Sequence, residues 1–174
     1  DWVAQSFRMK KDSQLPAKVS VHPAGNDFFT TMPCLLPSDK ERFGVKVVSR
    51  ILGRTPSLSS DILLYNSANG ELLALINADW ITSMRTGAVA TLAIKTLRSS
   101  SARKYSFIGL GNTARATLLC LLSSFPDEIF QVVLFRYKDQ AEYFIDYFRT
   151  FGNVVFSVVD TMEELVEDAD VLVS

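Results

Sequence analysis

The chain has 174 residues, 48% of them hydrophobic, and a formal net charge of −1. This length allows one domain or two small ones with a sizeable core, and the balanced charge gives no reason to expect a nucleic acid or a membrane surface as partner. Because His22 is the only histidine, the sequence excludes a Cys/His metal cluster and a local Ser-His-Asp arrangement, so we expect no metal.

Strand patterns dominate the first part of the chain, after the end of a helix in residues 1–11. Alternating or continuous apolar residues predict strands at 17–22, 27–32, 43–48, 62–65 and 72–76. The turn signals Gly25-Asn26 and Asn69-Gly70 predict two hairpins. Pro33 and Pro37 are expected to enclose a loop that contains Cys34, and residues 50–60 are expected to form another loop.

Lys46 stands inside the otherwise apolar segment 43–48. An unpaired charge is costly to bury, so this lysine needs a partner or a route to water. One interpretation is an edge-strand lysine whose charged end reaches solvent. The other is a cation that binds the carboxylate of a substrate, and the residues alone leave both open.

Residues 79–97 form the longest helical pattern of the chain. Apolar side chains occur on several faces, which predicts a largely buried helix, and small residues such as Gly87 would allow close packing. Arg85-Thr86 lies within this pattern. Because a buried guanidinium must face an anion, Arg85 indicates either a structural ion pair or a clamp for a phosphate or carboxylate. The polar residues 98–103 then predict a linker.

Residues 104–122 have the pattern of a strand, a glycine turn and a helix. Gly109, Gly111 and Ala114 match the spacing of G-x-G-x-x-G/A, which opens dinucleotide-binding βαβ units. Gly109 would permit the tight turn, and Gly111 would let the backbone approach a diphosphate at the start of the helix. Taken alone, the motif is also compatible with a turn that binds no nucleotide.

The rest of the chain alternates strands and helices. Apolar runs predict strands at 131–135, 154–159 and 171–173, helical spacing predicts a helix at 139–151, and Thr161 and Glu164 have the spacing of a capping box. This alternation predicts an α/β fold with a parallel sheet and crossover helices.

Localisation and extent follow from simpler signals. Cys34 and Cys120 stand among apolar neighbours, which predicts buried free thiols in a reducing compartment. Without a signal peptide or an apolar run of about 18 residues, a cytoplasmic protein is expected. Both ends look cut, because no initiator Met precedes Asp1 and no loop follows the last apolar segment. We therefore expect a fragment of a longer enzyme.

Two segments together resemble the ornithine cyclodeaminase/μ-crystallin family: ITSMRTGAVATLAIKTL at 81–97 and FIGLGNTAR at 107–115. MPC at 32–34 and GVKVVS at 44–49 agree with the family in order and spacing. The resemblance implies a substrate and dimerisation domain of mixed α+β structure, of which residues 1–98 with helix 79–97 would be the first part. Residues 99–174 would be part of a Rossmann dinucleotide-binding domain.

The resemblance also implies an activity. Family members use NAD or NADPH to move a hydride at the α-carbon of an amino acid or imine, and a homodimer is expected. Their activities include ornithine cyclisation to proline with loss of ammonia, ketimine reduction, amino-acid dehydrogenation and opine-like cleavage. The alternatives are a non-catalytic, crystallin-like protein that binds NADP(H), and an opine-like amino-acid synthase of the same family.

Substrate residues carry over by position. Lys46 matches the strand lysine that binds the substrate carboxylate, and Met32 would line the substrate pocket. Lys18 falls near an arginine of the family that also contacts the carboxylate. This is a departure, because lysine cannot make the planar two-pronged contact of arginine. The family's catalytic aspartate would lie beyond Ser174, so no catalytic residue can be named.

Cofactor residues carry over in the same way. Arg85 and Thr86 match the helix positions near the phosphates, and Ser57 falls where a cofactor-contacting threonine is usual. The implied diphosphate contacts at the turn are Gly109, Gly111, Asn112 and Thr113, the last two departing from the usual residues. After strand 131–135, Arg136 and Lys138 stand where an NAD-preferring site would carry an acid. This slightly favours NADP over NAD, although both could simply be solvated charges.

Overall fold

The computed structural model describes residues 2–174, and the chain divides into two compact units, residues 1–82 and 83–174. The division falls inside helix α2 (Asp79–Leu97), whose bounds are those that the sequence predicts. The domain boundary expected at residue 98 lies at the end of the same helix, and as a functional boundary it stays a prediction.

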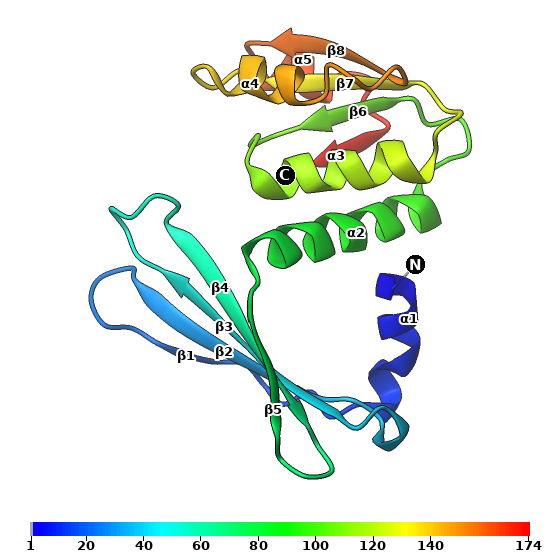
Figure 1. Cartoon of the computed structure of the whole chain (residues 1–174). Coiled ribbons are helices and arrows are strands. Elements are labelled where there is room, and N and C mark those ends of the chain that lie inside the picture. Colours follow the sequence, from blue (N-terminus) through cyan, green and yellow to red (C-terminus); the bar gives the residue numbers. More distant parts are fainter. Residues whose placement is uncertain (1) are drawn as a thin grey trace. The chain divides into compact units, whose positions relative to one another are not determined.

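The first unit is a five-stranded antiparallel sheet preceded by helix α1 (Trp2–Met9) and the 3-10 turn η1 (Lys10–Asp12). Its strands lie in chain order (Figure 1), which makes the sheet a meander, and the short turn η2 (Ser38–Lys40) joins two of them. The strands are β1 (Val19–Val21), β2 (Phe28–Leu35), β3 (Arg42–Arg50), β4 (Leu58–Asn66) and β5 (Leu72–Asn77). All five predicted strands and both hairpins are confirmed.

Strand β2 continues through Pro33 and Cys34, where the sequence predicts a loop. The ladder between β1 and β2 ends at Thr31, so beyond this residue β2 is paired in a ladder with β3 alone. Proline cannot donate a ladder hydrogen bond, but it is tolerated where one side of a strand is unpaired. The predicted loop around Cys34 is therefore wrong.

The start of α2 is fastened to the sheet of the first unit. The backbone N–H of Ser60 on β4 donates to Asp79 Oδ1 at 2.5 Å, and the hydroxyls of Ser60 and Thr82 lie 2.8 Å apart. Ser60 is buried, with 2% of its surface exposed. Asp79 in the first turn also places a negative charge at the positive end of the helix dipole.

The second unit is a parallel sheet in the order β8-β7-β6-β9. The strands are β6 (Lys104–Phe107), β7 (Phe130–Phe135), β8 (Val154–Val159) and β9 (Val171–Val173), connected by helices α3 (Asn112–Ser124), α4 (Gln140–Tyr147) and α5 (Met162–Val166). The chain moves outward from β6 to β8 and returns to place β9 on the other side of β6. The predicted Rossmann-type sheet with crossover helices is confirmed.

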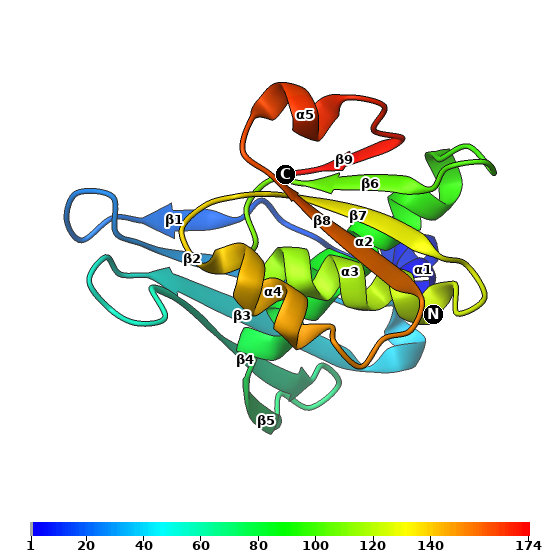
Figure 2. The ribbon, with the colours of Figure 1, turned by 90° about the horizontal axis from the view of Figure 1, so that it is seen from above.

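Successive side chains of β6 point to opposite faces of this sheet. Tyr105 and Phe107 belong to a buried core with residues of α3 and α4, where the ring centroids of Phe107 and Phe144 lie 6.0 Å apart. Ser106 points the other way, and its buried hydroxyl donates to the carbonyl of Leu165 in α5 at 2.6 Å. In Figure 2, α5 accordingly lies beyond β9, apart from α3 and α4.

Two local predictions in this unit have different outcomes. The capping box of Thr161 and Glu164 is present in both directions at the start of α5, as predicted. The helix predicted at 139–151 is shorter than expected, because α4 ends at Tyr147. Phe148 remains buried beyond the helix end, which means that the apolar spacing continues through turns after the helical geometry has stopped.

Candidate functional site

The turn between β6 and α3 leaves the start of α3 open to a ligand. Gly109 has φ of +79°, in the left-handed region that favours glycine. A Cβ added at Gly111 would meet nothing within 4 Å, and this N-cap residue makes no side-chain hydrogen bond to the helix. The first N–H groups of α3 and the positive end of its dipole are therefore available to an anion.

The residues after the glycines complete this cradle. Asn112 and Thr113 are exposed at the first turn of α3, whereas Leu110 and Ala114 are buried with 2% and 8% of their surface exposed. Ala114 thus occupies the position at which only a small side chain fits against the sheet. The open backbone and the buried alanine fit the diphosphate of a dinucleotide.

Helices α2 and α3 approach each other closely next to this turn. A Cβ on Gly87 would lie 2.4 Å from the carbonyl carbon of Ala116, and the hydroxyl of Thr91 donates to the carbonyl of Thr117 at 3.3 Å. Figure 1 shows the two helices side by side and running in the same direction. Arg85, two residues before Gly87, therefore lies toward the same end of the helix pair as the glycine turn.

Arg85 is exposed, not buried as the sequence predicts, and Thr86 is half-buried. The buried positions of α2 are Gly87 and Thr91, which face α3. At about 100° per residue, Arg85 lies roughly 200° around the helix from Gly87, which points it away from α3. Within residues 2–174 it makes no ion pair, so a structural ion pair does not account for it there.

Arg136, at the carboxyl end of β7, has two carboxylate partners. Its Nε donates to Asp160 Oδ1 at 2.7 Å and its Nη1 to Glu142 Oε1 at 3.0 Å, and all three side chains are exposed. These hydrogen bonds, above all that to Asp160, raise the pKa of Arg136. Lys138 lies over the ring of Tyr137, with Nζ 5.3 Å from the ring centroid. Sequence reasoning singled out Arg136 but missed both of its partners.

Met32 on β2 is paired with Lys46 on β3. Lys18 lies immediately before β1, whose last pair with β2 is Val19 with Thr31, so Lys18 is next to Met32 in sequence register but outside the ladder. Paired residues on neighbouring antiparallel strands point to the same face. Lys18 is exposed, and the other two are half-buried. The predicted substrate residues are thus brought together, while their role stays a prediction.

Ser57 lies in the loop between β3 and β4, immediately before β4 begins. Its carbonyl accepts a hydrogen bond from the backbone N–H of Ile51 at 2.9 Å, which closes this loop, and its side chain is exposed. Ser57 belongs to the first unit and the glycine turn to the second. Its contact with a cofactor therefore stays a prediction.

A model of the ornithine cyclodeaminase/mu-crystallin family matches residues 1–174. The chain belongs to this family. Among its relatives, the Δ1-pyrroline-2-carboxylate reductase of Bacillus cereus is 28% identical over 141 residues, which cover 77% of this chain and 42% of that protein. The ketimine reductase mu-crystallin of Mus musculus is 30% identical over 120 residues, covering 68% of this chain and 36% of that protein.

Solved structures agree with this assignment. The Δ1-pyrroline-2-carboxylate reductase of Thermococcus litoralis, in complex with NADH and L-proline, matches with a TM-score of 0.86 and 28% identity over 98% of this chain and 55% of its own. An archaeal alanine dehydrogenase dimer with bound NAD matches with a TM-score of 0.82 and 27% identity over 94% and 51%. The chain spans about half the length of these relatives.

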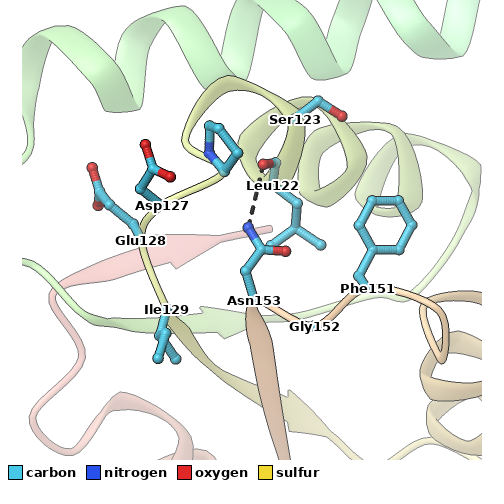
Figure 3. A pocket seen from close by; sticks show the side chains of 9 residues that line it. Leu122, Ser123, Asp127, Glu128, Ile129, Phe151, Gly152 and Asn153 are labelled. Atoms are coloured by element: carbon cyan, nitrogen blue, oxygen red, sulfur yellow. Dashed lines mark hydrogen bonds between the residues drawn. The ribbon is translucent and has the colours of Figure 1, made fainter.

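A cavity of about 520 Å³ lies in the second unit. It is at the amino ends of the strands, whereas the glycine turn follows the carboxyl end of β6. The cavity is formed by the end of α3, the segment before β7 and the turn before β8, where Asn153 donates to the carbonyl of Leu122 (Figure 3). Ligands of open α/β sheets bind outside the carboxyl ends of the strands, so this cavity at the amino ends is not the family's cofactor site.

The acidic side chains and the two cysteines were the remaining candidates for a metal site or a reactive thiol. Among residues 2–174, no group of three or more His, Cys, Asp or Glu side chains could hold a metal ion, and no helix is long and apolar enough to cross a bilayer. Cys34 and Cys120 are free and half-buried rather than fully buried, and burial raises the pKa of each thiol. Both therefore favour the neutral thiol over the nucleophilic thiolate.

Proposed function

We propose that the whole protein containing this chain is an NAD(P)-dependent oxidoreductase or cyclodeaminase that acts at the α-carbon of an amino acid or cyclic imine. The observation that carries this proposal is the uncapped start of α3 behind Gly109 and Gly111. The family relatives with reductase and dehydrogenase names support the same activity.

Within this proposal the second unit binds the coenzyme. The N–H groups of Asn112 and Thr113 would hold the diphosphate, whereas Arg85 points away from α3 and its contact with the phosphates stays a prediction. The bound dinucleotide supplies or accepts the hydride. The chain's own contribution is to bind and orient this coenzyme, because the aspartate expected to transfer the proton lies outside residues 1–174 by the family's pattern.

The first unit supplies candidates for binding the substrate carboxylate. Lys46 is paired with Met32, and Lys18 directly precedes Val19, which is paired with Thr31 next to Met32. Two ammonium groups offer a carboxylate charge without the fixed fork of a guanidinium. We therefore expect the α-carboxylate of the substrate to be held between the two lysines.

Location and assembly belong to the same proposal. A cytoplasmic protein fits the two free thiols, and a homodimer fits the dimeric state of the archaeal alanine dehydrogenase. Sedimentation of the whole protein at several concentrations tests the dimer. A single species with the mass of one protomer at all concentrations would reject it.

Two measurements on the whole protein test the function. Titration with NADH and NADPH, followed by nicotinamide fluorescence, should show saturable binding. Incubation with cyclic imines such as Δ1-pyrroline-2-carboxylate, and with amino acids in the reverse direction, should then change the absorbance of the coenzyme. Binding of neither coenzyme would reject the proposal. Binding without turnover of any substrate would instead favour the non-catalytic alternative. The reason to consider this alternative is that Lys18 falls near the position of an arginine in the family.

Variants of Lys18 and Lys46 test whether these residues bind the substrate carboxylate. Lys46→Met should raise the KM for the carboxylate substrate about 10- to 100-fold, the effect of losing one charged hydrogen bond, while NADH binds as before. Lys18→Arg should lower the KM, because it restores the two-pronged contact. Lys40→Met, which removes an exposed lysine paired with Asp39, is the matched control. If Lys46→Met and Lys40→Met give the same KM for the carboxylate substrate, Lys46 does not bind the substrate.

A further inference from the structure

The carboxyl end of β7 is where a Rossmann fold distinguishes NAD from NADP, and in this chain two strands contribute to it. Phe135 is paired with Val159, and the backbone N–H of Arg136 donates to the carbonyl of Val159 at 2.9 Å. Asp160 follows Val159 directly. The parallel register therefore brings Asp160 from the end of β8 to the side of Arg136, 24 residues earlier in the chain.

Arg136 is shared between Asp160 and Glu142, which come from different elements. The Nε of Arg136 donates a hydrogen bond to Asp160, and its Nη1 donates one to Glu142 in the first turn of α4. The two contacts fix the guanidinium between two carboxylates. A 2′-phosphate that approached Arg136 would have to displace one of these carboxylates or lie against both.

The charges around this point do not favour a further anion. The segment 136–142 and residue 160 together contain two basic and three acidic residues. The basic residues are Arg136 and Lys138, and the acidic residues are Asp139, Glu142 and Asp160. A phosphate monoester carries about −1.5 to −2 charges at neutral pH. Of these acids, the fold places Glu142 and Asp160 against Arg136, so this guanidinium already faces two carboxylates.

We propose that Asp160, with Glu142, compensates Arg136 and so makes the site select NAD(H) over NADP(H). Asp160 is the specificity-determining residue in this cluster: it occupies the Nε of the guanidinium that would otherwise bind a 2′-phosphate. A carboxylate from β8 thereby replaces the acid that NAD-preferring sites usually carry at the end of the preceding strand. The inference rests on the proposed function, and it reverses the slight preference for NADP that Arg136 and Lys138 suggest in the sequence.

Binding constants measured on the whole protein test this selection without requiring turnover. Dissociation constants for NADH and NADPH, from nicotinamide fluorescence or calorimetry, are compared for the wild type, Asp160→Asn and Asp146→Asn. Asp146 is the matched control, because it is also an exposed aspartate in an ion pair, with Arg149, on the same helix as Glu142. Glu142→Gln provides a second variant of the cluster itself.

The wild type should bind NADH more tightly than NADPH. Asp160→Asn should shift the ratio of the two constants toward NADPH about tenfold, the effect of removing one charge close to a phosphate, and Glu142→Gln should shift it in the same direction. Asp146→Asn should leave the ratio unchanged. Tighter binding of NADPH by the wild type, or an Asp160→Asn ratio equal to that of the control, would overturn the inference while the proposed function stands. Binding of neither coenzyme would reject both.

Discussion

Replacement of Gly87 by alanine should destabilise the second unit. The added Cβ would lie 2.4 Å from the carbonyl carbon of Ala116 and 2.6 Å from the amide nitrogen of Thr117. Both atoms belong to the backbone of α3, so no side chain can turn aside and the two helices must separate. Overpacking of this kind costs about 1–3 kcal/mol, and alanine recovers about 1 kcal/mol over glycine in a helix. With contacts this short, we expect a net loss of about 2 kcal/mol.

Urea unfolding of the whole protein, followed by circular dichroism, measures this loss. Gly152→Ala is the control, because a Cβ there would meet nothing within 4 Å, and it should leave stability unchanged or raise it by up to about 1 kcal/mol. A Gly87→Ala protein as stable as the Gly152→Ala protein would refute the close approach of the two helices.

Three further changes test the second unit. Phe144→Ala removes a fully buried ring of the core and should cost about 3–5 kcal/mol in urea unfolding; a loss below 1 kcal/mol would contradict its place there. Thr161→Ala removes the capping box of α5 and should cost about 1 kcal/mol, seen as a lower urea midpoint. The Arg98 guanidinium lowers the pKa of Glu128 below its ordinary 4.5, so this stabilisation is present above pH of about 4.5 and is lost as the pH falls through the lowered value. Acid titration of Glu128→Gln should lack this component.

The regular elements could be predicted because their signals are local. Asp79 opens α2 and the helical pattern runs to Leu97, so the sequence predicts both ends of this helix. The apolar run at 154–159 likewise gives β8 without error. Pro33 misled the prediction because its tolerance in β2 depends on where the pairing with β1 ends. That limit is set by the register of two strands and has no local signal.

The glycine turn of the candidate site could be predicted, because glycine favours the backbone conformation that this turn requires. Gly109 and Gly111 indicate the open turn, whereas the pairing of Met32 with Lys46 is set by the register of β2 and β3, which no local pattern contains. The exposure of Arg85 could not be predicted, because α2 has apolar residues on several faces and only its contact with α3 decides which face is covered. The pairing of Arg136 with Asp160 depends on the register of two parallel strands, which no local pattern contains.

Arg85 and Arg98 have different physical roles although both come from the α2 region. Arg98, with 10% of its side chain exposed, donates to Glu128 at 2.7 Å and to the hydroxyl of Tyr105, and it lies 4.1 Å from the ring centroid of Phe125. Its charge is thus neutralised within the unit, at the amino ends of the strands, and its loss should reduce stability without affecting the coenzyme. Arg85 is exposed and makes no ion pair within residues 2–174. Neither burial nor a partner among residues 2–174 therefore explains Arg85, and its exposed charge is available to an external anion.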